Sequence, residues 1–495
     1  MVTAVLNIIN SFSTEDSSYV SALALTLVLS VLVSYTPPGN VRQWSCTLSG
    51  LLFTVLYCNY QAVHVLLFVA ATYTVTVCVS IKQWKPVTFF LLFLYISTLR
   101  LLHVFSIWQL NNFVNGVLMI LVLKMISAVF DHRDAVYNKR LISQDVVDDE
   151  IRLKSVKMPE YNMLDLFHYS FCFMGLFTGP IFTYRTYYDF VHQRFTPKKS
   201  DKIPEILHRL KFFIIIIPLF LFFSRYKSAY LHTEEFAETT VFFKIAYMFP
   251  LFTMFRLRMY FGWLLAEVCF VIAGFGAYPK WSEPKPGKGP TKNAYEIYSL
   301  STSLTDGSGS TGASEAERQE EERDTEYSFE TVRNMDVVGV ETMLTMQDGV
   351  RCWNMCVQWW LVQYTFKECP IKSMRKPATF FVSALWHGVR SGYFLSFMCV
   401  PLLNFSAVIF EKAFMKNETI QKSRVVSAIV TVISWVLTNQ YWNYLNMAFY
   451  LLSGAQTLKF WSQIYFLYHG IAITIILCNY VVKKLTKKPK VEKED

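Results

Sequence analysis

Long apolar runs recur along almost the whole chain, and they constrain its fold more than any other feature. About 20 apolar residues are enough to cross a bilayer as a helix. Five candidate spans of this kind cover residues 19–35, 44–60, 62–80, 87–105 and 113–130. Inside a bilayer every backbone polar group must be paired internally, which helices achieve. The sequence therefore predicts an all-α, polytopic membrane protein.

Apolar runs continue through the second half of the chain, but several are short or interrupted by Gly and Pro. They cover residues 163–179, 211–224, 241–255, 259–278, 378–410, 425–437, 441–453 and 461–482. We expect about eleven transmembrane helices, the run at 378–410 being long enough for two segments. Interrupted segments such as residues 353–366 predict re-entrant or short helices, because irregular backbone at membrane depth lines a protected cavity. A buried tunnel is therefore expected.

Charge is scarce and is distributed between the apolar runs. Only 17% of the 495 residues are charged, against about a quarter in soluble domains. The net charge of +10 comes from 47 basic and 37 acidic residues in short clusters rather than on one soluble face, which argues against a nucleic-acid partner. The basic tail at 483–495 predicts a cytosolic C-terminus. We predict one membrane domain over 1–495.

One segment, residues 281–326, differs from the rest in composition. It begins "WSEPKPGKGPTK", continues into a Ser-, Gly- and Glu-rich stretch, and contains few large apolar residues. Such a composition buries little core, so the segment is expected to be a disordered, solvent-facing loop insert. A plain linker and a regulatory element both fit it.

Ionisable residues inside the apolar runs mark the interior of the helix bundle. They are Arg100, His103, Lys124, Asp165, His168, Lys244, Glu267, His387, Arg390 and His469. Such groups line a cavity, make a structural hydrogen bond or extend toward the membrane surface. The GxSxG, HExxH and Walker motifs do not occur, which weakens hydrolase, zinc-protease and nucleotide-phosphate functions. The scattered cysteines predict no metal site.

Two polar groups stand out in otherwise apolar, Trp-rich surroundings. Asn354 lies in "DGVRCWNMCVQWWLVQYTFKECP", where a helix would place Gln358 on its face, and His387 lies in "TFFVSALWHGVRSGYFLSF". The separation of 387 − 354 = 33 residues allows the two to face each other across a helical hairpin. A neutral imidazole can deprotonate an alcohol, and an amide can stabilise an oxyanion. A structural hydrogen bond fits the same pattern.

These two stretches resemble the membrane-bound O-acyltransferase family, and within it the lysophosphatidylinositol acyltransferase branch. Other similar stretches are "MGLFTGPIFTYRTYYDF", "FRLRMYFGWLLAE", "AGFGAYP", "YSFETVRNMD" and "LKFWSQIYFLYH". The resemblance implies an endoplasmic-reticulum enzyme with a membrane-embedded tunnel, in which His387 is the catalytic histidine and Asn354 its paired asparagine. It also implies acyl-CoA as co-substrate, lysophosphatidylinositol as acceptor and a polyunsaturated, arachidonoyl-like acyl chain. No metal or prosthetic cofactor is implied.

Further side chains near these motifs are candidates for substrate binding. They are Trp353, Gln358, Trp359, Trp386, Arg185, Arg351 and Arg390. The phosphates of coenzyme A require cations, although each Arg also fits a loop or a membrane-surface position. Alternatives to lysophosphatidylinositol acylation are another lysophospholipid, a protein or peptide hydroxyl and, in a different class, a transporter or channel. The expected partners are acyl-CoA, a lysophospholipid and the bilayer, and the oligomeric state stays open.

Overall fold

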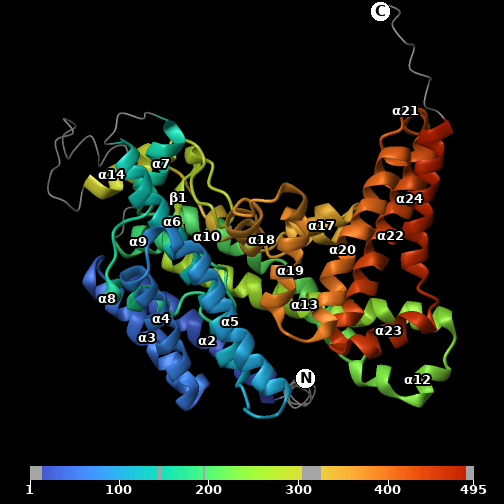
Figure 1. Cartoon of the computed structure of the whole chain (residues 1–495), viewed down its shortest axis with the longest axis horizontal. Coiled ribbons are helices and arrows are strands. Elements are labelled where there is room, and N and C mark those ends of the chain that lie inside the picture. The colour runs from blue at the N-terminus through green and yellow to red at the C-terminus, as the bar shows by residue number, and fades with distance from the viewer. Residues whose placement is uncertain (1–13, 143–147, 193–194, 304–324, 486–495) are drawn as a thin grey trace, which may run out of the picture. The chain divides into compact units, whose positions relative to one another are not determined.

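The chain is almost entirely helical, as predicted, with one pair of two-residue strands in the part that the structure describes (Figure 1). The structure is a computed structural model, and it describes residues 14–142, 148–192, 195–303 and 325–485. The strands β1 (Tyr278–Pro279) and β2 (Tyr327–Ser328) pair antiparallel.

The chain forms two compact units rather than one, and each combines three chain segments. The first unit contains residues 1–221, 257–335 and 354–379, and the second contains residues 222–256, 336–353 and 380–495. The single membrane domain over 1–495 stays a prediction, because a domain can contain two compact units. Their boundary does not lie at one point of the sequence, because each unit is assembled from runs that are far apart along the chain.

The first unit is built around α6 (Asn112–Ile142), whose stretch from Leu121 to Phe130 is apolar except at Lys124 and Ser127. All residues of this stretch are buried, as expected for helical residues without a polar face. Lys124 is accommodated there because its Nζ donates a hydrogen bond to the carbonyl of Tyr169 at 2.6 Å.

Other helices of the first unit are α2 (Thr14–Ser34), α3 (Asn40–Cys58), η1 (Asn59–Ala62), α4 (Val63–Cys78), η2 (Ile81–Gln83), α5 (Trp84–Val104), α7 (Asp149–Lys157), α8 (Met163–Ser170), α9 (Tyr184–Val191), α10 (Lys199–Leu210), η4 (Lys280–Ser282), α14 (Ala294–Ser303), η5 (Glu330–Val332), α18 (Met355–Leu361), η6 (Val362–Phe366) and η7 (Lys372–Met374). Three helices contribute residues to both units: α11 (Phe213–Phe223), α13 (Val241–Ala273) and α19 (Arg375–His387).

The second unit packs α20 (Ser391–Phe410) against α22 (Arg424–Leu451) and α24 (Leu467–Leu485). Its core contains buried Leu403 of α20 with Tyr441, Tyr444 and Ala448 of α22. The remaining elements are η3 (Ser228–His232), α12 (Glu234–Glu238), α16 (Val337–Glu341), α17 (Met346–Cys352), η8 (Glu411–Met415), α21 (Glu418–Gln421) and α23 (Gly454–Gln463). Large aromatic and aliphatic side chains thus supply this core, as in other helical bundles.

The number of candidate membrane spans is smaller than the eleven predicted. Within the described residues seven helical stretches are long and apolar enough to cross a membrane, or eight if the pair α23 and α24, bent by 73°, is one span. One reason is that the apolar runs 241–255 and 259–278 contribute to one continuous helix, α13. Another is that the run at 163–179 contains only the eight-residue helix α8.

The first part of the predicted loop insert, residues 281–303, carries regular structure. It contains a tight turn closed between Lys285 and Gly289, followed by α14. Ile297 and Tyr298 of α14 are buried and belong to a small core with Tyr278. A few apolar side chains are enough here because they pack on an existing surface. Residues 304–324 of the predicted insert and residues 486–495 of the predicted tail lie outside the described residues.

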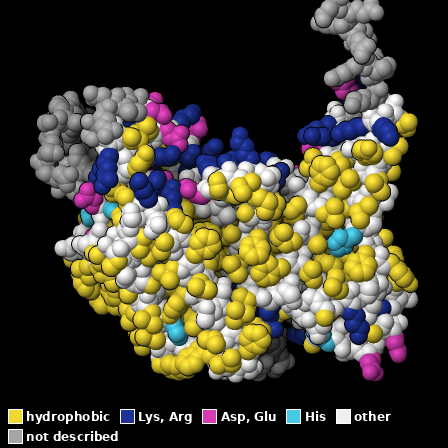
Figure 2. Space-filling model, viewed as in Figure 1, with side chains coloured by type: hydrophobic (Ala, Val, Ile, Leu, Met, Phe, Trp, Pro, Cys, Tyr) yellow, Lys and Arg dark blue, Asp and Glu magenta, His cyan; other side chains and the backbone are white. Residues whose placement is uncertain are grey.

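The surface is rich in exposed apolar side chains, as expected for a protein that faces lipid. Ile214 of α11 is 77% exposed, and Leu32, Val55 and Val425 are also exposed. Figure 2 shows hydrophobic side chains over much of the visible face of each unit, whereas Lys and Arg gather near α7 and α14 in the first. Contiguous apolar surface of this extent is rare on soluble proteins.

Candidate active site

Asn354 immediately precedes α18 in the first unit and has a left-handed backbone. Its φ is 47° and its ψ is 53°. The preceding residue, Trp353, is extended, and α18 begins directly after Asn354. Few residues other than Gly and Asn adopt this conformation readily. Its side chain does not cap α18, although its carbonyl accepts the N–H of Gln358 at 2.9 Å. The amide group is therefore not used to start the helix.

A buried chain of hydrogen bonds fixes the backbone next to Asn354. Oε1 of Glu267 accepts the N–H groups of Asn334 and Met335 at 2.7 and 3.1 Å. The carbonyl of Asn334 in turn accepts the N–H of Met355 at 2.8 Å, and its side-chain oxygen accepts that of Cys356 at 3.4 Å. The first turn of α18 is thereby tied to α13.

Glu267 is itself held by a cation. Its Oε2 accepts Nε of Arg209 at 2.8 Å, and both side chains are almost fully buried. Arg209 also pairs with Glu205. A buried carboxylate requires such partners, because an unpaired charge in this environment is strongly unfavourable.

The tryptophans of α18 anchor this helix rather than leaving it exposed. Trp360 is fully buried, and its Nε1 donates to the carbonyl of Leu123 on α6 at 3.0 Å. Trp359 packs edge-on against Tyr364 and against the backbone of Gly287, where an added Cβ would lie 2.6 Å from its ring. Gln358 is half-buried one turn after Asn354.

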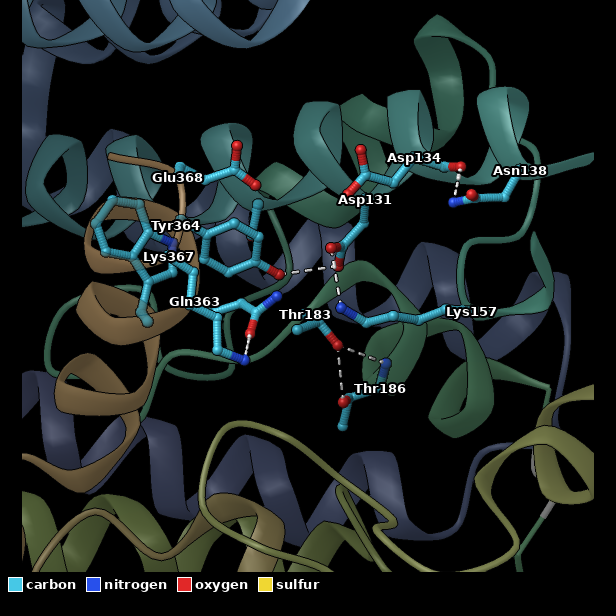
Figure 3. A network of polar contacts seen from close by, with 12 residues as sticks. Asp131, Asp134, Asn138, Lys157, Thr183, Thr186, Gln363, Tyr364, Lys367 and Glu368 are labelled. Carbon is cyan, nitrogen blue, oxygen red and sulfur yellow. Dashed lines mark hydrogen bonds and ion pairs between the residues drawn. The ribbon is translucent and has the colours of Figure 1, made fainter. Parts of the chain in front are cut away.

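A polar network continues from α18 into η6 (Figure 3). The hydroxyl of Tyr364 donates to Asp131 of α6 at 2.9 Å, and Nζ of Lys157 donates to the same carboxylate at 2.9 Å. Nearby, Nζ of Lys85 pairs with Asp134 and with Glu368 at 2.9 and 2.8 Å. The carboxylates of this network thus already have cationic partners.

Arg185, a predicted substrate-binding residue, is buried and satisfied by protein groups. It is 1% exposed, pairs with Asp189 at 2.9 Å and donates to the carbonyl of Tyr298 at 3.3 Å. Burial disfavours its charge, but the Asp189 carboxylate outweighs burial and raises the pKa of the guanidinium. These contacts favour a structural role for Arg185.

His387 ends α19 in the second unit and is surrounded by aromatic rings. Its ring centroid lies 5.1 Å from that of Phe397 in a stacked arrangement, and 5.3 and 4.8 Å from those of Phe449 and Trp386 in edge arrangements. Tyr393 lies at 6.0 Å. The imidazole is half-buried and faces an apolar environment.

Two glycines let the backbone approach this ring cluster closely. A Cβ on Gly388 would lie 2.6 Å from the ring of Tyr393, and one on Gly392 would lie 2.4 Å from the carbonyl oxygen of Ala448. The N–H of Gly392 donates to the carbonyl of Leu452 at 2.9 Å. Close helix packing therefore accounts for both glycines.

The other candidates from the sequence lie in the second unit. Trp353 stacks on Phe255 and meets Trp442 edge-on, so it belongs to an aromatic core. Arg351, at the end of α17, and Arg390, before α20, are exposed. Neither side chain is committed to a buried ion pair, unlike Arg185.

The structure thus groups the candidates in two sets. Asn354, Gln358 and Trp359 lie together on α18, and His387 and Trp386 lie together at the end of α19. Because the two sets belong to different units, the pairing of Asn354 with His387 stays a prediction. The described residues contain no group of three or more His, Cys, Asp or Glu side chains able to hold a metal ion.

Sequence reasoning missed the support around Asn354 and His387. Asn334 and Phe449 were not singled out, and Glu267 was noted only as a charge in an apolar run. Asn334 lies in "YSFETVRNMD", one of the stretches with a family resemblance, which was the available signal. Phe449 is one of 42 phenylalanines and carried no signal of its own.

The helical fold and its extensive apolar surface are typical of an integral membrane protein. Its polar candidates are an asparagine at a helix start and a histidine in an aromatic cluster. The chain belongs to the membrane-bound O-acyltransferase family, whose family model matches residues 57–454.

Among individual proteins, the chain is similar to membrane-bound acylglycerophosphatidylinositol O-acyltransferases. The Xenopus laevis protein is 30% identical over 488 residues, covering 98% of this chain and 97% of the relative. The Homo sapiens protein is 29% identical over 94% and 93% of the two chains. The Drosophila melanogaster protein is 28% identical over 92% and 89%. The similarity therefore extends over nearly the full length of these relatives.

Proposed function

We propose that this protein transfers an acyl group from acyl-CoA to the free glycerol hydroxyl of lysophosphatidylinositol. The observation that carries the proposal is the near-full-length similarity to acylglycerophosphatidylinositol O-acyltransferases, together with the presence of both Asn354 and His387. The resemblance to this branch supports a polyunsaturated, arachidonoyl-like donor, a membrane-embedded tunnel and a location in the endoplasmic reticulum.

In this proposal His387 is the general base. Its neutral imidazole accepts the hydroxyl proton of the lysolipid while the hydroxyl oxygen attacks the thioester carbonyl. The tetrahedral intermediate collapses by breaking the carbon–sulfur bond, and the imidazolium returns the proton to the departing CoA thiolate. The rings of Phe397 and Phe449 against the imidazole support this role, because an apolar wall limits hydrolysis of the thioester.

Asn354 contributes the amide in the same proposal. It donates a hydrogen bond to the oxyanion that forms on the thioester carbonyl, or it orients the attacking hydroxyl. Two observations support a chemical role: the side chain does not cap its helix, and the adjacent backbone is held by Asn334 and Glu267. Removing one oxyanion donor typically lowers kcat by about 10²–10³-fold.

The test is an acyltransferase assay on purified full-length protein in bilayer nanodiscs. The donor is labelled arachidonoyl-CoA or palmitoyl-CoA, and the acceptors are the lyso forms of phosphatidylinositol, phosphatidylcholine, phosphatidylserine and phosphatidylethanolamine. We expect the inositol lipid and the arachidonoyl donor to react fastest. Faster acylation of lysophosphatidylcholine would refute the acceptor assignment.

The catalytic assignment is tested with His387→Ala and a matched control, His232→Ala. His232 is an exposed histidine at the end of η3. We expect His387→Ala to abolish transfer and His232→Ala to keep it. Full transfer by His387→Ala would show that another group is the base.

A further inference from the structure

A compact, lysine-bearing turn lies against α18, in the segment 281–326 that the sequence predicts to be a loop insert. Its sequence from Pro284 to Pro290 is "PKPGKGP". The N–H of Lys285 donates to the carbonyl of Gly289 at 3.0 Å, and the N–H of Gly289 donates to the carbonyl of Lys285 at 3.1 Å. Three prolines and this reciprocal pair fix the conformation of the turn.

The turn is clamped onto α18 through Gly287. The N–H of Gly287 donates to the carbonyl of Thr331 at 2.9 Å, and its φ of 69° favours glycine. A side chain at this position would collide with Trp359, because an added Cβ would be 2.6 Å from the ring. The lysines on either side of Gly287 are consequently held beside the helix that begins at Asn354.

Two more lysines, on other elements, act electrostatically on this turn. Lys367 follows η6, and Lys157 ends α7, where Asp131 holds it (Figure 3). Partial burial lowers the pKa of Lys288. The charges of its neighbours lower it further, in the order Lys367, Lys285 and Lys157. The charges of three other lysines therefore act on Lys288.

The positive charge of this place is not cancelled locally. Nζ of Lys367 donates to the amide oxygen of Gln363 at 2.9 Å, not to a carboxylate. Across the described ranges, no carboxylate lies within ion-pair distance of Lys285, Lys288 or Lys367. All three side chains reach the surface, with Lys288 partly covered by neighbouring atoms. Adjacent ammonium groups repel one another, so such a cluster fits a ligand that carries several negative charges.

Both substrates of the proposed reaction carry phosphate. The distance between the reacting atom, placed at Asn354, and the phosphorus distinguishes the two substrates. At about 1.5 Å per residue, Trp359 lies about 8 Å and Lys367 about 20 Å beyond Asn354 along the helix. In acyl-CoA about thirteen bonds separate the thioester sulfur from the first phosphorus, which is about 15 Å when extended. In a lysophospholipid about four bonds, or about 5 Å, separate the reacting oxygen from phosphorus. Only the phosphates of acyl-CoA would reach the stretch between Trp359 and Lys367.

We propose that Lys285, Lys288 and Lys367 form a phosphate-binding rim that receives the coenzyme A part of the acyl donor, with Lys157 adding to its positive field. The inference rests on the proposed acyl transfer at Asn354. The turn holds two of the cations in place before the donor arrives, which reduces the entropy lost on binding. Lys285, Lys288 and Lys367 position the donor and take no part in the chemical step.

The test compares Lys285→Gln/Lys288→Gln/Lys367→Gln with Lys280→Gln/Lys292→Gln in full-length protein. The control lysines lie in or next to the same segment, but they are exposed and are paired with Glu326 and Glu283. Nanodiscs of phosphatidylcholine alone remove anionic bilayer lipid as a ligand. We expect the triple variant to raise KM for arachidonoyl-CoA about tenfold with kcat within twofold, and the control variant to match wild type.

Two competitors separate the phosphate of the donor from that of the acceptor. The triple variant is expected to weaken inhibition by 3′,5′-adenosine diphosphate about tenfold and to leave inhibition by glycerophosphoinositol unchanged. The difference in donor KM is expected to shrink in high salt, because exposed charges are screened. A rise in KM for the lysolipid instead of the donor, or no rise at all, would overturn the proposal.

Direct binding of coenzyme A distinguishes failure of the rim from failure of the proposed function. If wild type transfers no acyl group but binds coenzyme A about tenfold more tightly than the triple variant, the rim stands and the function fails. Equal binding by both proteins, with equal thermal stability, refutes the rim whatever the activity.

Discussion

Replacing Glu267 with Gln tests whether the buried support of Asn354 matters for stability and for turnover. Glu267 is 1% exposed and accepts hydrogen bonds from two backbone N–H groups and from Arg209. A glutamine keeps the shape but has only one accepting oxygen. The new NH₂ group of the glutamine therefore faces either the guanidinium of Arg209 or the N–H of Asn334. Two hydrogen-bond donors then face each other in a buried place, which is unfavourable.

The magnitude follows from these contacts. Hydrogen bonds to a charged group contribute about 1.5–3 kcal/mol each, and breaking a buried pair costs about 3–5 kcal/mol. Arg209 keeps Glu205 as a partner, which reduces the loss. We expect Glu267→Gln to lower the free energy of unfolding by about 3 kcal/mol. Turnover should fall up to about 100-fold, because a small shift of Asn354 disturbs the reacting geometry.

The assay measures thermal unfolding and acyl transfer on purified protein, with Glu326→Gln as the matched control. Glu326 pairs with Lys280 at the surface, where its side chain is 73% exposed, so its replacement should change stability by less than about 1 kcal/mol. If Glu267→Gln and Glu326→Gln both retain wild-type stability and turnover, the buried chain does not support Asn354.

Two further predictions concern packing and a buried hydroxyl. Gly392→Ala should destabilise the protein by about 2 kcal/mol, because the added Cβ meets backbone atoms of Ala448 and Leu452 that cannot move aside. The matched Gly470→Ala, where a Cβ meets nothing within 4 Å, should be neutral or stabilising, and equal unfolding midpoints for the two would contradict this account. Tyr364→Phe should cost about 1 kcal/mol by removing the hydrogen bond to Asp131, and thermal unfolding at the wild-type midpoint would refute that contribution.

The helical membrane fold could be predicted from the sequence because apolar length is a local property. The continuity of helices was harder to predict. Arg256 and Arg258 suggested a break between two apolar runs, yet α13 passes through them. Part of the reason is that Arg256 pairs with Glu341 at 3.0 Å, 85 residues away in the sequence. No local pattern contains that partner.

Single residues of the candidate site could also be predicted from the sequence, but their distant partners could not. Asn354 and His387 stood out as polar groups in apolar stretches, but Asn334 and Glu267 are 67 residues apart and meet only in the folded chain. Arg185 was a different case, because Asp189 follows it at i+4 within the same motif. That spacing is typical of a helical ion pair and was a signal against substrate binding.

The five-residue π-helix η6 has a consequence for how this region tolerates changes in length. The N–H of Lys367 donates to the carbonyl of Val362, five residues earlier. One extra residue per turn rotates everything beyond it by about 100° relative to an α-helix. Deleting a single residue between 362 and 366 would remove the extra residue, so the turn would close as an α-helix and Lys367 would keep its direction. Closing the turn as an α-helix with all its residues kept would instead rotate Lys367 by about 100°. The width of this turn, and not only the identity of its residues, therefore sets where the charge of Lys367 lies.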